Sequence, residues 1–209
     1  MAPTVQHQRH AGRKTTADDD SANYRQRLLD ALAESINQHG YPKTTVADVV
    51  RRARTSRRTF YEHFSDKETC FIALLTEANG EMIRHILAAV DRGVPWQIQI
   101  RQAVEAWVAC VESRPTLMLS WIREGPALGE AARRLQRDAM EAFIVMVHRL
   151  CDTDELRSAG VSPVSRRRAI MLLGGLRELT AVTVESGERV SDNIDDAVDA
   201  AIALLGPRT

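Results

Sequence analysis

The sequence lacks several features that would direct an assignment elsewhere. Cysteine occurs three times in 209 residues, at Cys70, Cys110 and Cys151, which is too sparse for a disulfide framework or a zinc site. The first twenty residues contain no apolar core of a secretory signal, and no apolar run approaches the length that a bilayer requires. We therefore expect a cytoplasmic protein with no membrane partner.

Net charge is also absent, because 28 basic residues balance 28 acidic residues. The positive charge is nevertheless concentrated, since residues 40–64 carry six basic and two acidic side chains. A local basic patch is typical of a nucleic-acid-binding surface, whose partner is a polyanion.

Catalytic patterns are missing as well. No serine, cysteine or lysine is accompanied by a recognisable base and orienting group, so we expect no enzyme and no cofactor. Glu77, Glu81 and His85 share a helical face, but this spacing is more typical of a solvated surface than of a metal site. We accordingly predict no bound metal.

Helical periodicity dominates what is present, and no window alternates apolar and polar residues as a strand does. We predict an all-α fold of about nine helices. Residues 1–20, with almost nothing apolar to bury, are expected to form a flexible basic arm, and a first amphipathic helix is expected over Ala22–His39. Later helices are expected near residues 95–113, 115–123, 126–150, 163–187 and 192–205.

Capping signals divide the basic region into short helices. Thr45 and Asp48 have capping-box spacing, Ser56 is placed to cap the next helix, and Ser65 with Glu68 repeats the capping-box pattern before a long fourth helix. Two short helices joined by a tight turn form a helix-turn-helix, which lays its second helix in the major groove of DNA. Arginines on that helix, Arg57 and Arg58, are suited to guanine edges, although arginines on a short exposed helix are also common on surfaces without a partner.

The order of these motifs over residues 25–70 resembles the amino-terminal signature of the TetR family of transcriptional regulators. The resemblance implies a DNA-binding domain over residues 21–68 whose third helix enters the groove. It also implies a helical ligand-binding and dimerisation domain over residues 69–209. The DNA contacts expected from the resemblance and the local chemistry are Thr44, Thr45, Arg54, Ser56, Arg57, Arg58, Thr59, Tyr61, His63 and Lys67.

Two positions depart from the family pattern. Arg54-Thr55 stands where most members have Gly-Val, so Arg54 is either strained or supplies an additional phosphate contact. Arg58 stands where many members have glycine, which makes it a candidate for this protein's own sequence preference. The basic arm, with Arg9, Arg13 and Lys14, is placed either to reach a minor groove or to remain an unstructured tail.

The larger domain carries no family-specific motif. Its last two helices, near 163–187 and 192–205, are apolar on several faces and suggest a homodimer interface, the alternative being packing within one subunit. Bulky side chains on the middle helices are candidates for an apolar pocket, or else for a filled core. These candidate ligand-binding residues are Trp96, Trp107, Met118, Trp121, Phe143 and Met146.

The sequence therefore predicts a homodimeric regulator, most simply a repressor, that binds a palindromic double-stranded DNA operator and is released by a small apolar or amphipathic effector. Three alternatives stay open at this point. They are a transcriptional activator, a regulator that needs no effector, and a helical adaptor whose residues 40–68 bind another protein.

Overall fold

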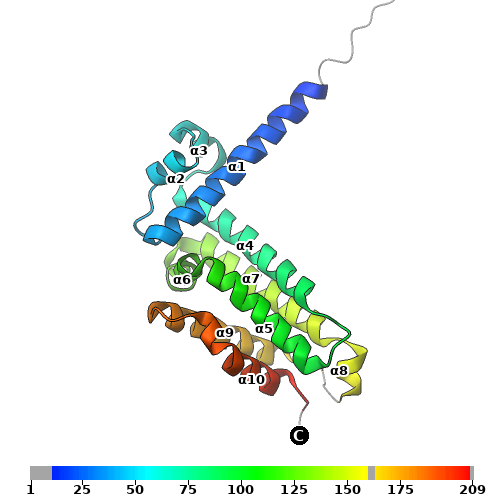
Figure 1. Ribbon diagram of the computed structural model, residues 1–209. Coiled ribbons are helices and arrows are strands. Elements are labelled where there is room, and N and C mark those ends of the chain that lie inside the picture. Colours follow the sequence, from blue (N-terminus) through cyan, green and yellow to red (C-terminus); the bar gives the residue numbers. More distant parts are fainter. Residues whose placement is uncertain (1–10, 160–162, 208–209) are drawn as a thin grey trace, which may run out of the picture.

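The computed structural model describes residues 11–159 and 163–207, and within these ranges the chain is helical with no strand (Figure 1). The all-α prediction is therefore confirmed. The helices are α1 (Ala11–His39), α2 (Val46–Arg52), α3 (Arg57–His63), α4 (Lys67–Ala89), α5 (Trp96–Ser113), α6 (Pro115–Arg123), α7 (Gly129–Cys151), α8 (Asp154–Ser158), α9 (Arg166–Glu185) and α10 (Ile194–Leu205), with 3-10 turns η1 (Gly125–Ala127) and η2 (Val190–Asn193).

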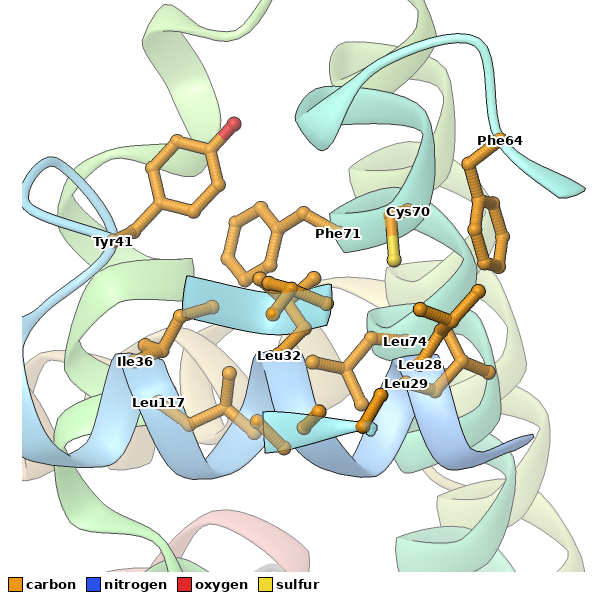
Figure 2. Close-up of a cluster of buried hydrophobic side chains, with 14 of the residues drawn as sticks. Leu28, Leu29, Leu32, Ile36, Tyr41, Phe64, Cys70, Phe71, Leu74 and Leu117 are labelled. Carbon is orange, nitrogen blue, oxygen red and sulfur yellow. The ribbon is translucent and has the colours of Figure 1, made fainter. Parts of the chain in front are cut away.

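The first core lies between α1, the two short helices α2 and α3, and the start of α4 (Figure 2). Leucines and an isoleucine at helical spacing on α1 form its floor, because positions three and four apart share one helical face. Phe71 of α4 stacks on Tyr41, with ring centroids 4.3 Å apart. Phe60 is fully buried within it. These leucines and the isoleucine of α1 are Leu28, Leu29, Leu32 and Ile36.

A second core fills the larger helical body, in which α4, α5 and α7 run side by side and α9 and α10 cover one face (Figure 1). Val111 of α5, Ile144 of α7 and Ala169 of α9 are almost completely buried there. Within the described ranges no helix combines the length and apolar character that crossing a bilayer needs.

Helix α6 connects the two cores. Leu117 belongs to the first core (Figure 2), as does Trp121, and Met118 packs against both cores. The other side of α6 is tied to α9, because Arg123 forms ion pairs with Glu178 at 3.0 Å and Glu185 at 2.6 Å. A movement of α6 would therefore displace side chains in both cores.

Three local expectations were wrong. The first helix begins at Ala11 instead of Ala22, because Asp18–Asp20 disfavour a helix only mildly and no proline stops it. Residues 11–20 of the predicted arm thus lie in α1, while residues 1–10, Arg9 among them, lie outside the described residues. The long fourth helix is capped by Asp66, not Ser65, since an ionised carboxylate is the stronger acceptor for the Thr69 N–H.

The stretch between residues 151 and 163, expected to be a break, contains the short helix α8. Thr153 caps it by accepting the N–H of Leu156. The described residues thus hold ten α-helices where about nine were expected. The domain boundary between residues 68 and 69 stays a prediction.

Candidate DNA-binding surface and apolar cavity

The two short helices begin where the sequence predicts. Thr45 caps α2, with its hydroxyl accepting the Asp48 N–H at 3.2 Å and its own N–H donating to the Asp48 carboxylate at 3.1 Å. The Thr45 hydroxyl also donates to the Asp48 carboxylate at 2.6 Å, and this bond, followed by the one from the Thr45 N–H, lowers the pKa of Asp48 below its ordinary value. Ser56 caps α3 by accepting the N–H of Thr59 at 3.0 Å. The predicted capping box and the predicted cap at Ser56 are both confirmed.

The turn between these helices places an arginine in a conformation that favours glycine. Arg54 has φ of 50°. The Thr55 N–H bonds to the Val50 carbonyl at 3.0 Å, and the Arg54 N–H bonds to the Arg51 carbonyl at 3.2 Å. These two bonds form a Schellman motif with Arg54 at its left-handed position, which costs a non-glycine residue about 1 to 2 kcal/mol. Two interpretations of Arg54 were open, backbone strain and an additional phosphate contact, and its backbone conformation shows the strain.

Helix α3 has one buried and one exposed face. Phe60 is fully buried and Phe64, which follows the helix, is 4 % exposed. Arg57 and Arg58 point away from that core, as does Tyr61, which is 57 % exposed. The Arg58 side chain pairs with Glu62 at 3.0 Å on an exposed surface, and such a pair contributes little stability. The outer face of α3 is therefore available to a partner.

The basic cluster is only partly neutralised. Arg51 pairs with Asp48, and Arg52 pairs with Glu34 of α1. Within the described part of the chain, Arg54 and Arg57 form no ion pair, and neither does Lys43. Positive charge without an acidic partner thus remains beside the exposed face of α3.

Two of the expected DNA contacts point inward. Thr44 is 1 % exposed and its hydroxyl donates to the Gly40 carbonyl at 2.9 Å. The Lys67 ammonium donates to the carbonyls of Tyr41 at 2.9 Å and Thr44 at 2.8 Å, and it lies 4.1 Å from the centre of the Tyr41 ring. Burial lowers the pKa of Lys67. Lys67 therefore ties the start of α4 to the turn between α1 and α2, and Thr44 bonds within that turn.

The remaining expected contacts lie near the surface. The Thr45 and Thr59 hydroxyls are engaged at the two caps, and His63 is half-buried in the last turn of α3. Sequence reasoning missed Arg27 of α1, whose guanidinium donates to the carbonyls of Ala53 and Arg54 and so supports the strained turn. Helical spacing gave no signal for that contact, because it joins distant segments.

A cavity of about 180 Å³ lies inside the larger helical body. Its wall is formed by α4, α5, α6, α7, α8, α9 and α10. All six side chains that the sequence suggested for a pocket line it, namely Trp96, Trp107, Met118, Trp121, Phe143 and Met146. The wall is thus largely apolar, which suits an apolar ligand.

Some lining residues were not anticipated. Asn79 of α4 and Gln136 of α7 line the cavity, and Arg177 of α9 does so while donating to the Ile122 carbonyl at 2.9 Å. Burial lowers the pKa of Arg177. Polar residues on predicted amphipathic helices are normally assigned to the solvent face, so the sequence held no signal for them.

Comparisons with known proteins agree with this geometry. Residues 28–74 match the model of the family described as bacterial regulatory proteins, tetR family. The chain is 29% identical over 134 residues to the HTH-type transcriptional repressor AcnR of Corynebacterium glutamicum, covering 58% of this chain and 69% of that protein. It is 29% identical over 183 residues to an uncharacterized HTH-type transcriptional regulator of Mycobacterium bovis, covering 86% of this chain and 89% of that protein.

The solved structures show the same fold across both parts of the molecule. The transcriptional regulator FadR from Bacillus subtilis, solved in complex with stearoyl-CoA, superposes with a TM-score of 0.72 at 15% sequence identity. The match covers 88% of this chain and 99% of that one. At this identity the likeness concerns the fold.

Proposed function

We propose, from the premise that the chain belongs to the TetR family of transcriptional regulators, that it is a ligand-released repressor of its target promoter. The observation that carries the proposal is the outward face of α3, where Arg57, Arg58 and Tyr61 stand opposite the buried Phe60. A repressor is among its relatives, which favours repression over activation.

On DNA, α3 is the helix that would enter the major groove. Arg57 and Arg58 stand in its first turn, where side chains of a recognition helix reach base edges. An arginine fork suits the two acceptors of guanine, and leaving Glu62 costs Arg58 little because that pair is exposed. Tyr61 and the free N–H groups at the start of α3 suit the phosphate backbone. Thr44 and Lys67 act by holding this unit together.

Two copies of α3 require a dimer. On α9, Met171 and Val182 are 55% and 50% exposed, and a Cβ added at Gly175 between them would meet no atom within 4 Å. This apolar strip with a small residue at its centre suits close approach of a second α9. Leu172 and Ala181 are instead buried within the subunit. We propose that the outer face of α9, together with α10, forms the homodimer interface. This dimer would set its two α3 helices about 34 to 36 Å apart on a palindromic operator.

The cavity is the proposed effector site, and α6 is the element that reports its occupancy. Trp121 lines the cavity and also belongs to the core beneath α3. The Ser120 hydroxyl accepts the Tyr41 N–H at 3.4 Å, at the turn that Lys67 holds. An effector that displaces Trp121 therefore shifts the base of the DNA-binding unit. The FadR relative with stearoyl-CoA supports an effector with a long apolar portion.

The test is DNA binding measured by fluorescence anisotropy, using duplexes from upstream of the protein's own gene at several salt concentrations. Affinity should fall steeply as salt rises, because phosphate contacts release counterions. Arg58→Ala should reduce the preference for the operator over unrelated DNA, with a loss of about 1 to 3 kcal/mol at the operator.

Arg134→Ala is the matched control, because Arg134 is an exposed arginine of α7 that makes no ion pair within the described residues. It removes the same charge and should leave operator preference unchanged. Equal loss in both variants would contradict the assignment of α3, and binding that ignores salt would favour the protein-adaptor alternative.

A further inference from the structure

The apolar cavity contains a small number of polar groups, and their hydrogen bonds differ. Five lining residues carry an amide, hydroxyl or guanidinium group. They are Asn79, Gln99, Gln136, Arg177 and Thr180.

Three of the five are already engaged by the protein. The Gln99 amide donates to the Val94 carbonyl at 2.8 Å and to Glu155 at 2.9 Å. The Thr180 hydroxyl donates to the carbonyl one turn earlier at 2.8 Å, and Arg177 donates to the Ile122 carbonyl. The Gln99 and Thr180 groups therefore have a partner within the protein, and Arg177 has one of its donors engaged.

The other two are unpaired donors. Asn79 Nδ2 and Gln136 Nε2 are inaccessible to solvent and have no hydrogen-bond partner among the described residues. Leaving a buried donor unpaired costs about 1 to 3 kcal/mol, and buried polar groups in proteins are nearly always paired. Two such donors in the wall of one cavity indicate a ligand that brings acceptors.

The Gln136 donor lies at the α6 end of the cavity. A Cβ placed on Gly125 would lie 3.2 Å from Gln136 Nε2 and 2.7 Å from the Trp121 ring. Trp96, the first residue of α5, instead lies beside the end of α10, because its ring is 3.1 Å from a Cβ placed on Gly206. The unpaired Gln136 donor and the Trp96 ring therefore lie beside different glycines, one next to α6 and one beyond α10.

We propose that the effector is an aliphatic molecule bearing a carbonyl oxygen, as a carboxylate or an ester, and that Asn79 and Gln136 donate to this oxygen. This inference rests on the proposed ligand-binding function and specifies its chemistry. The chain of the effector extends along the apolar wall toward Trp96. A cationic head group is disfavoured, because it offers no acceptor to the two amides and meets Arg177 in the same wall.

The three tryptophans of the chain all line the cavity, so intrinsic fluorescence reports its occupancy directly. The purified full chain is titrated with decanoate, methyl decanoate and decyltrimethylammonium, which share one chain length. Wild type should bind decanoate or methyl decanoate more tightly than the cation. Asn79→Leu and Gln136→Met should each weaken that binding by roughly three- to ten-fold, the value of one hydrogen bond.

Thr180→Val is the matched control, because it removes a lining hydroxyl that is already engaged. It should leave the preference among the three probes unchanged. Thermal unfolding without ligand separates recognition from structure. Because Leu and Met remove an unpaired donor, the midpoint should stay or rise in the two test variants, whereas a supporting structural role would lower it.

The outcomes separate this inference from the function on which it rests. Weakening with decanoate alone assigns a carboxylate, and weakening with both acceptor probes assigns a carbonyl oxygen. Equal affinity for all three probes, unchanged in both variants, overturns the carbonyl assignment while leaving an apolar effector site. If no probe alters the fluorescence, the proposed effector site itself is contradicted.

Discussion

The DNA-binding unit and the larger helical body are stabilised differently. In the first, α2, α3 and α4 each begin with a side-chain cap, from Thr45, Ser56 and Asp66. Around the cavity, α5, α6, α7 and α10 begin with no side-chain cap hydrogen bond, whereas α9 is capped by Ser165. The small unit is thus specified by local chemistry, whereas the larger body depends on packing between helices.

The two cores differ in the same way. Phe60 and Phe71 are fully buried in a filled core, while Phe143 and Trp107 of the larger body are only half-buried and line a cavity. A regulator in which ligand binding is coupled to DNA binding requires a rigid DNA-binding unit joined to a helical body with internal space. The larger body can adjust to a ligand, whereas the close-packed DNA-binding unit can only shift as a whole.

The largest expected contrast comes from truncating one phenylalanine in each part. Phe60→Ala should lower the free energy of unfolding by about 3 to 5 kcal/mol, because it leaves a void in a filled core. Phe143→Ala should cost about 1 to 2 kcal/mol, since that ring already borders open space. Urea unfolding measures both values, and similar costs would remove the distinction between the two cores.

A second contrast concerns Lys67, which ties the start of α4 to the turn between α1 and α2. Lys67→Met should lower the free energy of unfolding by about 2 kcal/mol, because two carbonyls lose a charged donor. The slope of log affinity for DNA against log salt should not change. A phosphate contact from Lys67 would instead reduce that slope by about 1. Lys43→Met, at an exposed lysine beside the same turn, is the control for charge.

A smaller effect is expected at the strained turn. Arg54→Gly should raise the free energy of unfolding by about 0.5 to 1 kcal/mol, because glycine tolerates φ of 50°. Arg54→Ala removes the same charge and keeps the strain, so it should not stabilise. If both variants bind operator DNA equally weakly, Arg54 also contributes a phosphate contact. Thermal unfolding and anisotropy measure the two effects, and equal stability of the two variants would contradict the strain.

The smallest effect is a pH dependence of the caps. The hydrogen bond from the Thr69 N–H lowers the pKa of Asp66 below its ordinary value of 3.8. The folded state therefore binds fewer protons than the unfolded state in acid, and stability falls as the pH drops through 3.8 and below. Asp66→Asn keeps a capping oxygen without a titrating group, so its difference from wild type, below about 1 kcal/mol, should shrink between pH 7 and pH 3. A difference that stays constant would show that the charge of Asp66 is irrelevant.

The same comparison explains what the sequence could predict. The capping residues Thr45 and Ser56 lie within a few positions of Phe60 and Phe64, so their spacing indicated the DNA-binding unit. The apolar residues of the cavity were also recognisable, because bulky side chains recur on the middle helices. The inward direction of Lys67, the support from Arg27 and the unpaired amides of Asn79 and Gln136 arise from contacts between distant segments, which local patterns do not encode.

The coupling between the cavity and α3 is tested most directly by Gly125→Ala. The added Cβ would lie 2.7 Å from the Trp121 ring, so the ring must move as it would for an effector. The account predicts that operator affinity, measured by anisotropy without any effector, falls about five-fold or more. Unchanged affinity, together with a tryptophan emission spectrum showing that Trp121 has moved, would contradict it.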